Sequence, residues 1–206
     1  MFQVFEYGNP NSNKVIIQTV GDHDADGMKK EASLIAKETE DFRLIAVKVD
    51  NWNKDLSPWE APPVFGDDPF GKGAKETLKE IIGLCSDKSR TYYIAGYSLA
   101  GLFALWAAFE TDIFKGVAAV SPSVWFPKFT DYIKENEIKS QKVYLSLGDK
   151  EAKTRNAVMS KVADCINEVH DHLKSRGVDC TLEWNPGNHF KEPDLRVAKG
   201  IIQILK

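Results

Sequence analysis

The sequence predicts an α/β fold in which a mostly parallel sheet is covered by helices on both faces. Apolar runs rich in β-branched residues alternate with segments of helical periodicity, and this alternation is typical of parallel sheets. A length of 206 residues suits one domain with a single core. No repeat, low-complexity stretch or proline-rich linker marks a boundary, so residues 1–206 are interpreted as one domain.

Strands are expected where short apolar runs contain β-branched or aromatic residues. In chain order they are 3–7, 15–20 (VIIQTV), 42–49 (FRLIAVKV), 92–95, 116–120, 143–147 (VYLSL) and 179–184. In a parallel sheet the carboxyl ends of such strands meet at one edge, and the loops that follow them carry the functional residues.

Helices are expected where apolar residues recur every three or four positions. In chain order they are 28–40, 74–84, 99–109, 154–175 and 195–205. The first places Leu34 and Ile35 on its inner face, and the fourth is long, amphipathic and ended by Gly177. The sequence between and around these elements has no stretch long enough for a helical lid.

The composition predicts a protein of the cytoplasm. Charged residues make up 28% and the net charge is −3, which gives no electrostatic reason to expect nucleic acid or an anionic membrane as partner. The first residues lack the basic start and apolar core of a secretory signal. Cys85, Cys165 and Cys180 form no CxxC pair and are interpreted as thiols in a reducing compartment.

One serine stands inside the most apolar run of the chain, YYIAGYSLAGLFALWAAF at 92–109. The run is short for a membrane span and lacks a basic flank, so it is interpreted as a strand, a tight turn and a buried helix, with Ser98 at the turn. G-Y-S-L-A-G resembles the G-x-S-x-G turn that exposes a nucleophilic serine, with Ala100 in place of the second glycine. The simpler alternative is a serine that caps a helix.

A nucleophilic serine needs a base and an acid, which follow it in the order serine, acid, histidine in this architecture. His189 lies in NPGNHF after the last strand, on the same sheet edge as Ser98. His23 lies on the correct edge but precedes the serine. The loop after VYLSL offers Asp149 and Glu151. Both remain candidates. We favour Glu151, since aspartate at such a position often bonds the amides of its own turn, and this is the alternative role expected for Asp149.

Four segments in this order resemble the esterase branch of the α/β-hydrolases, which includes siderophore (enterochelin) esterases and S-formylglutathione hydrolases. They are GYSLAGLFAL, SPSVWF, LSLGDKE and GNHF, and the resemblance extends from about residue 14 onward. It implies a serine hydrolase of esters with Ser98 as nucleophile, His189 as base and Glu151 as acid. The expected function is carboxylester hydrolysis of a small molecule without metal or organic cofactor.

Two other functions fit the same fold: a binding protein without catalysis, and a thioesterase or acyltransferase. For catalysis, the Leu99 amide and an amide near Asp22 or His23 are expected to stabilise the oxyanion. The segment 50–73 has no periodicity and is rich in aromatic residues. The residues expected to wall a substrate pocket are Trp52, Trp59, Phe65, Trp125 and Phe126. The alternative is a loop that packs on itself and covers the sheet.

The segment DHDADG at 22–27 begins like a calcium-binding loop. The position that should supply a bidentate glutamate is Ser33, however, and a strand rather than a helix precedes the segment. We therefore interpret these aspartates as residues that complement the start of the following helix.

Overall fold

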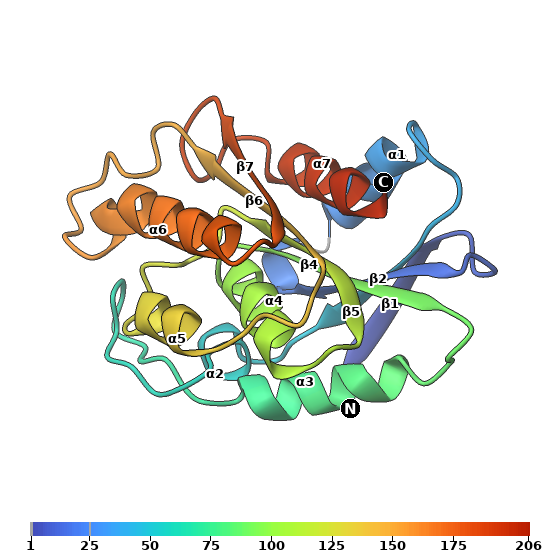
Figure 1. Ribbon diagram of the computed structural model, residues 1–206, viewed down its shortest axis with the longest axis horizontal. Helices are drawn as coiled ribbons and strands as arrows, with labels where there is room; N and C mark the ends of the chain where they lie inside the picture. Colours follow the sequence, from blue (N-terminus) through green and yellow to red (C-terminus); the bar gives the residue numbers. More distant parts are fainter. Residues whose placement is uncertain (1, 25) are drawn as a thin grey trace.

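The computed structural model describes residues 2–24 and 26–206 and is built on a seven-stranded sheet (Figure 1). The strands are β1 (Gln3–Gly8), β2 (Lys14–Val20), β3 (Arg43–Lys48), β4 (Thr91–Tyr97), β5 (Phe114–Val120), β6 (Lys142–Gly148) and β7 (Asp179–Asn185). Their order in the sheet is β1-β3-β2-β4-β5-β6-β7. Only the pairing of β1 with β3 is antiparallel. The predicted fold class is confirmed.

Helices cover both faces of this sheet (Figure 1). On one face lie α1 (Met28–Ala36) and α7 (Pro193–Leu205), and on the other α3 (Ala74–Leu84), α4 (Leu99–Glu110) and α6 (Val162–Ser175). The short helices are η1 (Asp22–Asp24), α2 (Trp52–Asp55), α5 (Phe129–Glu135) and η2 (Met159–Lys161). Each face has its own apolar core, because strands buried on both sides direct alternate side chains to opposite layers.

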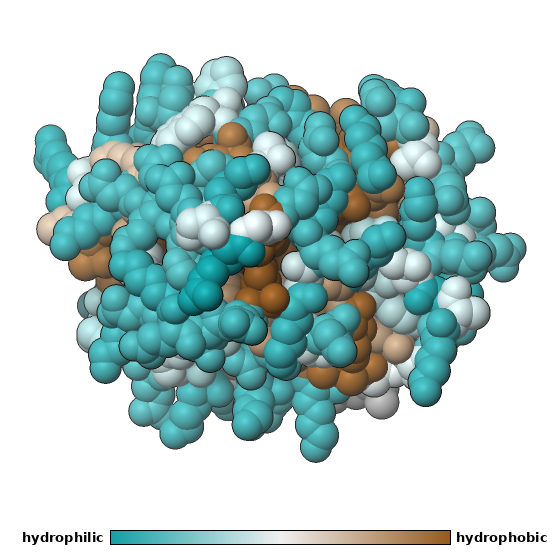
Figure 2. All heavy atoms as spheres, in the orientation of Figure 1, coloured by the Kyte–Doolittle hydropathy of each residue, from teal (hydrophilic) through white to brown (hydrophobic). Residues whose placement is uncertain are grey.

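Helix α4 explains the long apolar run of the sequence. Its residues from Leu99 to Phe109 are all buried between the sheet and the neighbouring helices, so the helix is apolar on every side rather than along one stripe. Within the described chain, no helix combines the length and apolar character that a membrane crossing needs. The face of the molecule seen in Figure 2 is largely hydrophilic, with smaller hydrophobic areas between the polar side chains.

Two predicted helices were too long. The expected helix over 154–175 begins with η2 and becomes α-helical only at Val162. Before it, the Asn156 side chain accepts bonds from the amides of Val158 and Met159, a local turn that competes with helix formation. The expected helix over 28–40 ends at Ala36, because the Ile35 carbonyl accepts the amides of both Glu38 and Thr39 in a closing turn.

A carboxyl group, Glu31 of α1, is buried between this helix and the sheet. The residue is 3% exposed, and Gln18 Nε2 lies 3.3 Å from its Oε2 atom. Burial raises the pKa of Glu31 to about 8; the Gln18 bond opposes this rise, while Asp194 and Asp24 add to it. The folded protein therefore holds a proton on Glu31 at pH values where the unfolded chain has lost it.

We expect Glu31→Gln to stabilise the protein increasingly as the pH rises. The protonated carboxyl contributes stability that is fully present below the unfolded pKa of 4.5 and lost as the pH rises through about 8. Glutamine has the same shape and never ionises, so the gain over wild type approaches an upper bound of about 5 kcal/mol above pH 8. Urea unfolding between pH 5 and 9 measures it. Glu38→Gln, at an exposed position, is the control, and parallel curves for Glu31→Gln and wild type would contradict the burial argument.

Candidate active site

Ser98 occupies a sharp turn between β4 and α4. Its φ of +58° is rare for a residue with a side chain. The turn brings strand and helix so close that a Cβ atom on Gly96 would lie 2.2 Å from the Ala100 carbonyl oxygen. A Cβ on Gly101 would lie 3.0 Å from the Gly96 carbonyl oxygen and 3.1 Å from that of Val120. Small residues on both sides of Ser98 therefore permit the turn.

Three side chains from three loops meet at this turn. The Ser98 Oγ atom lies 3.1 Å from His189 Nε2, and His189 Nδ1 lies 2.7 Å from Glu151 Oε2. Ser98 follows β4, Glu151 follows β6 and His189 follows β7, so all three lie at the carboxyl edge of the sheet. The structure thus brings together the three residues named from the sequence, in a continuous chain of hydrogen bonds.

The two acidic residues after β6 have different partners. Asp149 Oδ1 accepts the amide of Gly187 at 2.7 Å and so ties the β6 loop to the β7 loop. Glu151 points instead to the imidazole of His189, and its side chain is only 4% exposed. Burial alone would raise the pKa of Glu151, but hydrogen bonds from His189, Ser121 and the Gly148 amide outweigh it and hold the pKa below its usual value.

Further residues complete the site, and two of them, Ser121 and Ser123, lie in the SPSVWF segment. The Ser121 hydroxyl donates to Glu151 Oε1 at 2.7 Å, and the Ser123 hydroxyl lies 3.5 Å from that of Ser98. The Tyr97 hydroxyl donates to the His189 carbonyl. Arg196 contacts Glu151 from α7; its position on the buried face of a helix is the one signal that could have singled it out.

A pocket of about 510 Å³ opens over Ser98 and His189. Its apolar wall includes Trp52, Trp125 and Phe65, and its rim includes Phe190, which is 85% exposed. Of the tryptophans expected in this wall, Trp59 is not among the residues that line it. Its indole N–H donates to the Pro127 carbonyl, and its half-buried ring packs beside Phe126, Phe129 and Tyr132 against the core.

The comparisons with known proteins agree with this architecture. Siderophore hydrolase EstA from Aspergillus nidulans superposes with a TM-score of 0.71 at 17% identity, over 98% of this chain and 93% of that one. The protein has the α/β-hydrolase fold. Est1E from Butyrivibrio proteoclasticus gives a TM-score of 0.62 at 14% identity, over 98% and 92% of the two chains.

A longer protein contains the same fold as one part of its chain. The enterobactin esterase FES from Shigella flexneri gives a TM-score of 0.69 at 17% identity, and the match covers 98% of this chain but 53% of FES. The expected resemblance to siderophore and enterobactin esterases is therefore confirmed at the level of the fold.

Sequence comparison is less informative. No family model matches the chain. An uncharacterised protein of Bacillus subtilis strain 168, YbbA, is 23% identical over 150 residues, which is 65% of this chain and 59% of YbbA.

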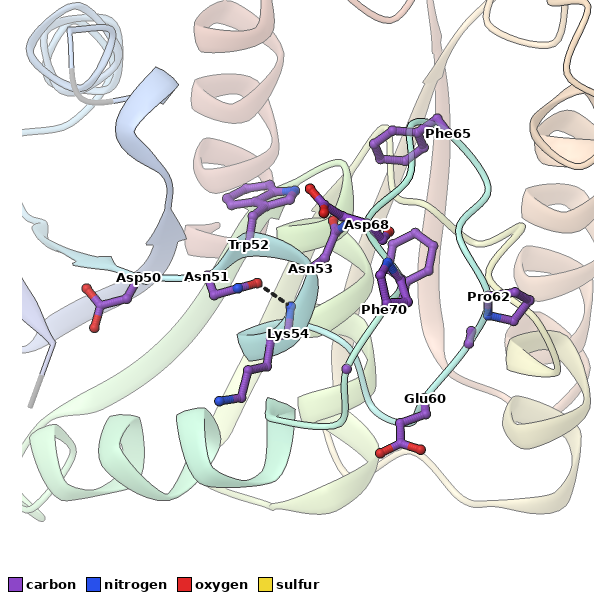
Figure 3. Close-up of a pocket in the computed structure, with 13 residues that line it drawn as sticks. Asp50, Asn51, Trp52, Asn53, Lys54, Glu60, Pro62, Phe65, Asp68 and Phe70 are labelled. Carbon is purple, nitrogen blue, oxygen red and sulfur yellow. Dashed lines mark hydrogen bonds between the residues drawn. The ribbon is translucent and has the colours of Figure 1, made fainter.

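A second groove of about 1040 Å³ lies beside the pocket over Ser98, along the loop after β3 (Figure 3). Trp52 and Phe65 line both the groove and the pocket. The Asn51 side chain accepts the Lys54 amide and caps α2, and Asn53 Nδ2 donates to the Asp68 carbonyl. These polar groups hold the loop in shape, and the residues that line the groove include no serine, histidine or cysteine.

The two positions expected to supply oxyanion-binding amides lie at element starts. Leu99 is the first residue of α4, where backbone N–H groups have no partner within the helix. Asp22 begins η1 after β2, and its 88%-exposed carboxylate pairs with Lys48. Its neighbour His23 lines the pocket and contacts Trp52 edge-on, with 4.8 Å between the ring centroids.

The remaining candidate groups are placed as follows. Ala25, within the segment that begins like a calcium loop, lies outside the described residues. Among the residues that the structure describes, no cluster of three or more His, Cys, Asp or Glu side chains is arranged to hold a metal ion.

All three cysteines are free. Burial raises the pKa of Cys85 and of Cys180 to about 12, so neither presents a reactive thiolate at neutral pH.

Proposed function

We propose that this protein is a serine hydrolase that cleaves carboxylic esters of small molecules. The observation that carries the proposal is the continuous chain of hydrogen bonds from Ser98 through His189 to Glu151. A hydroxyl, an imidazole and a buried carboxylate in this geometry are the parts that activate a serine for acyl transfer. The α/β-hydrolase fold, found also in proteins named as a siderophore hydrolase and an enterobactin esterase, supports the same chemistry.

The first half-reaction forms an acyl-enzyme. Ser98 Oγ attacks the ester carbonyl carbon while His189 Nε2 takes the hydroxyl proton, and the carbonyl electron pair moves to its oxygen. When the tetrahedral intermediate collapses, the bond to the alcohol oxygen breaks and His189 returns the proton to that oxygen. Glu151 accepts the bond from Nδ1–H, which keeps Nε2 free to act as base and stabilises the imidazolium.

The second half-reaction releases the acid. Water attacks the acyl carbon, His189 takes its proton, and Ser98 leaves with that proton restored. In both steps the Leu99 amide at the start of α4, together with an amide of Asp22 or His23, stabilises the oxyanion. One such donor accounts for about 2.7–4 kcal/mol of the barrier. No step requires a metal or an organic cofactor.

The pocket favours an uncharged ester with an apolar or aromatic part. Trp52, Phe65 and Trp125 offer apolar surface next to Ser98, and aromatic walls of this kind bind flat or apolar groups. A panel of aryl and alkyl esters, with matched thioesters and an added acceptor alcohol, separates ester hydrolysis from thioester hydrolysis and acyl transfer.

We expect a fluorophosphonate to label Ser98 and no other serine. Of the pocket serines, only Ser98 is hydrogen-bonded to an imidazole, whereas Ser121 donates to a carboxylate. Intact mass and peptide mapping locate the adduct. Ser98→Ala is expected to remain unlabelled, and Ser123→Ala serves as the matched control that keeps labelling. An adduct on Ser121 or Ser123 would refute the proposed function, and no adduct with no ester turnover would favour a binding protein.

A further inference from the structure

Arg196 of α7 is a buried cation next to the candidate site but outside its pocket. The residue is 2% exposed, and it is not one of the residues that line the cavity over Ser98. We propose that Arg196 is a positioning residue: it locks the Glu151 carboxylate and the loop of His189 into one unit and sets the pH range in which His189 works as a base. This inference rests on the proposed hydrolase function.

The two oxygens of Glu151 are used differently. Oε2 faces His189 Nδ1 at 2.7 Å. Oε1 accepts three donors: the Gly148 amide at 2.7 Å, the Ser121 hydroxyl at 2.7 Å and Arg196 Nη1 at 3.0 Å. The carboxylate cannot rotate without breaking these three bonds, so Oε2 is held toward the imidazole.

The same guanidinium also holds the loop that carries the base. Arg196 Nη2 donates to the carbonyl of Pro186 at 3.2 Å and to that of Asn188 at 3.1 Å, and His189 is the next residue. One rigid, planar fork thus fixes the acid on the β6 loop and the base on the β7 loop. A lysine at this position would keep the charge but not the fork geometry.

Packing of α7 against the sheet does not by itself require a buried arginine at residue 196. Arg196 lies on the face of α7 that otherwise buries Val197, Ile201 and Ile204, where an apolar side chain would meet no desolvation cost. The cation is satisfied because Glu151, Ser121 and two carbonyls of the His189 loop accept its hydrogen bonds, and Ser121 itself bonds Glu151. Its bonds therefore end on the groups that orient the base.

The charge of Arg196 also affects proton uptake by the imidazole. Glu151 contacts the ring directly, Arg196 acts through Glu151, and Tyr97 lies with its ring centroid 5.1 Å from that of His189. The other ionisable residues that line the same pocket are His23, Asp24 and Asp194, and Asp149 bonds the loop at Gly187. Without the guanidinium, no positive charge next to Glu151 offsets the attraction of its carboxylate for a protonated imidazole. Protonation of His189 is then favoured, and the neutral base is available only at higher pH.

The test compares Arg196→Met, Arg196→Lys and Ser121→Ala in pH profiles of kcat and kcat/KM with a neutral aryl ester. We expect Arg196→Met to lower kcat strongly with little change in KM, and to move the acidic limb of kcat/KM, the fall in rate toward low pH, to higher pH. Arg196→Lys should return the limb toward its wild-type position but recover only part of kcat. Ser121→Ala removes a neutral donor from the same oxygen, and because this hydroxyl carries no net charge its loss should move the limb less than the loss of the guanidinium does.

Each outcome separates the inference from the proposed function. The inference is overturned if Arg196→Met is folded and its acidic limb has not moved. It is also overturned if Arg196→Lys has the kcat of wild type, and this second test remains available even if Arg196→Met does not fold. If wild type neither labels nor turns over, the proposed function fails. The downfield proton NMR signal of His189 Nδ1–H then still tests the positioning by Arg196. The signal should persist in Ser98→Ala and be lost or displaced in Arg196→Met. An unchanged signal in Arg196→Met overturns the inference.

Discussion

Replacing His189 with alanine is expected to lower kcat for ester hydrolysis by about 10⁶-fold, the scale known for removal of the base in a serine protease. Without the imidazole at 3.1 Å, the Ser98 hydroxyl has no acceptor for its proton during attack, and the leaving alcohol has no donor. Single-turnover kinetics with a chromogenic ester should show that acylation itself is lost. Circular dichroism and thermal melting check that the variant is folded.

His23→Ala is the matched control for this prediction. His23 lines the same pocket, but its ring contacts Trp52 rather than the serine, so its removal should leave most of kcat and alter mainly KM. A folded His23→Ala protein as inactive as His189→Ala would show that the base is assigned to the wrong histidine. The activity of wild type is also expected to fall at acidic pH, because a protonated imidazole cannot accept the serine proton.

The second large effect is expected for Glu151→Gln, with a loss in kcat of about 10⁴-fold. Three donors converge on the Oε1 atom, so the amide oxygen of the glutamine should take that place. The amide NH₂ then faces His189 Nδ1, which must act as acceptor, and the ring proton moves to Nε2. In that tautomer Nε2 cannot accept the proton of Ser98, although the fold and the pocket remain intact.

Asp149→Asn distinguishes the two acidic residues of this loop. The asparagine carbonyl can still accept the Gly187 amide that Asp149 Oδ1 accepts, so kcat should stay near the wild-type value. A large loss in Asp149→Asn with Glu151→Gln near wild type would reverse the assignment of the acid. Near-normal rates in both variants would indicate that Ser98 and His189 work without a carboxylate.

Much of the fold could be predicted because its helices bury one side, or all sides, and its strands bury one or both sides, which leaves a pattern of apolar residues in the sequence. The predicted helix over 74–84 agrees with α3, and each predicted strand agrees with an observed one to within a few residues, since a core requires periodic apolar residues. Helices α2 and α5, of four and seven residues, are too short to establish a period. At residues 154–158, side chains that bond their own backbone decide the conformation.

The candidate site could be predicted where a loop follows a strand. Ser98, Glu151 and His189 each stand a few residues beyond a strand end, and parallel topology brings such positions to one edge. Trp59 was expected at the pocket because aromatic residues often line one, yet its indole N–H donates to the Pro127 carbonyl and its ring packs against the core. A loop without periodicity does not reveal in which direction a side chain points. Arg196 lies on a helix rather than after a strand, so the same rule does not select it.

The close approach of β4 and α4 has a consequence for recognising relatives of this chain. Backbone atoms crowd the Cα atoms of residues 96 and 101, two positions before and three positions after the serine. Residue 100, in contrast, carries a methyl group and is fully buried. After the serine, the crowded position is therefore residue 101, one place later than the second glycine of G-x-S-x-G. The pattern G-x-S-x-A-G describes this turn. A search for G-x-S-x-G passes over the chain, and its relatives should be sought by the longer spacing.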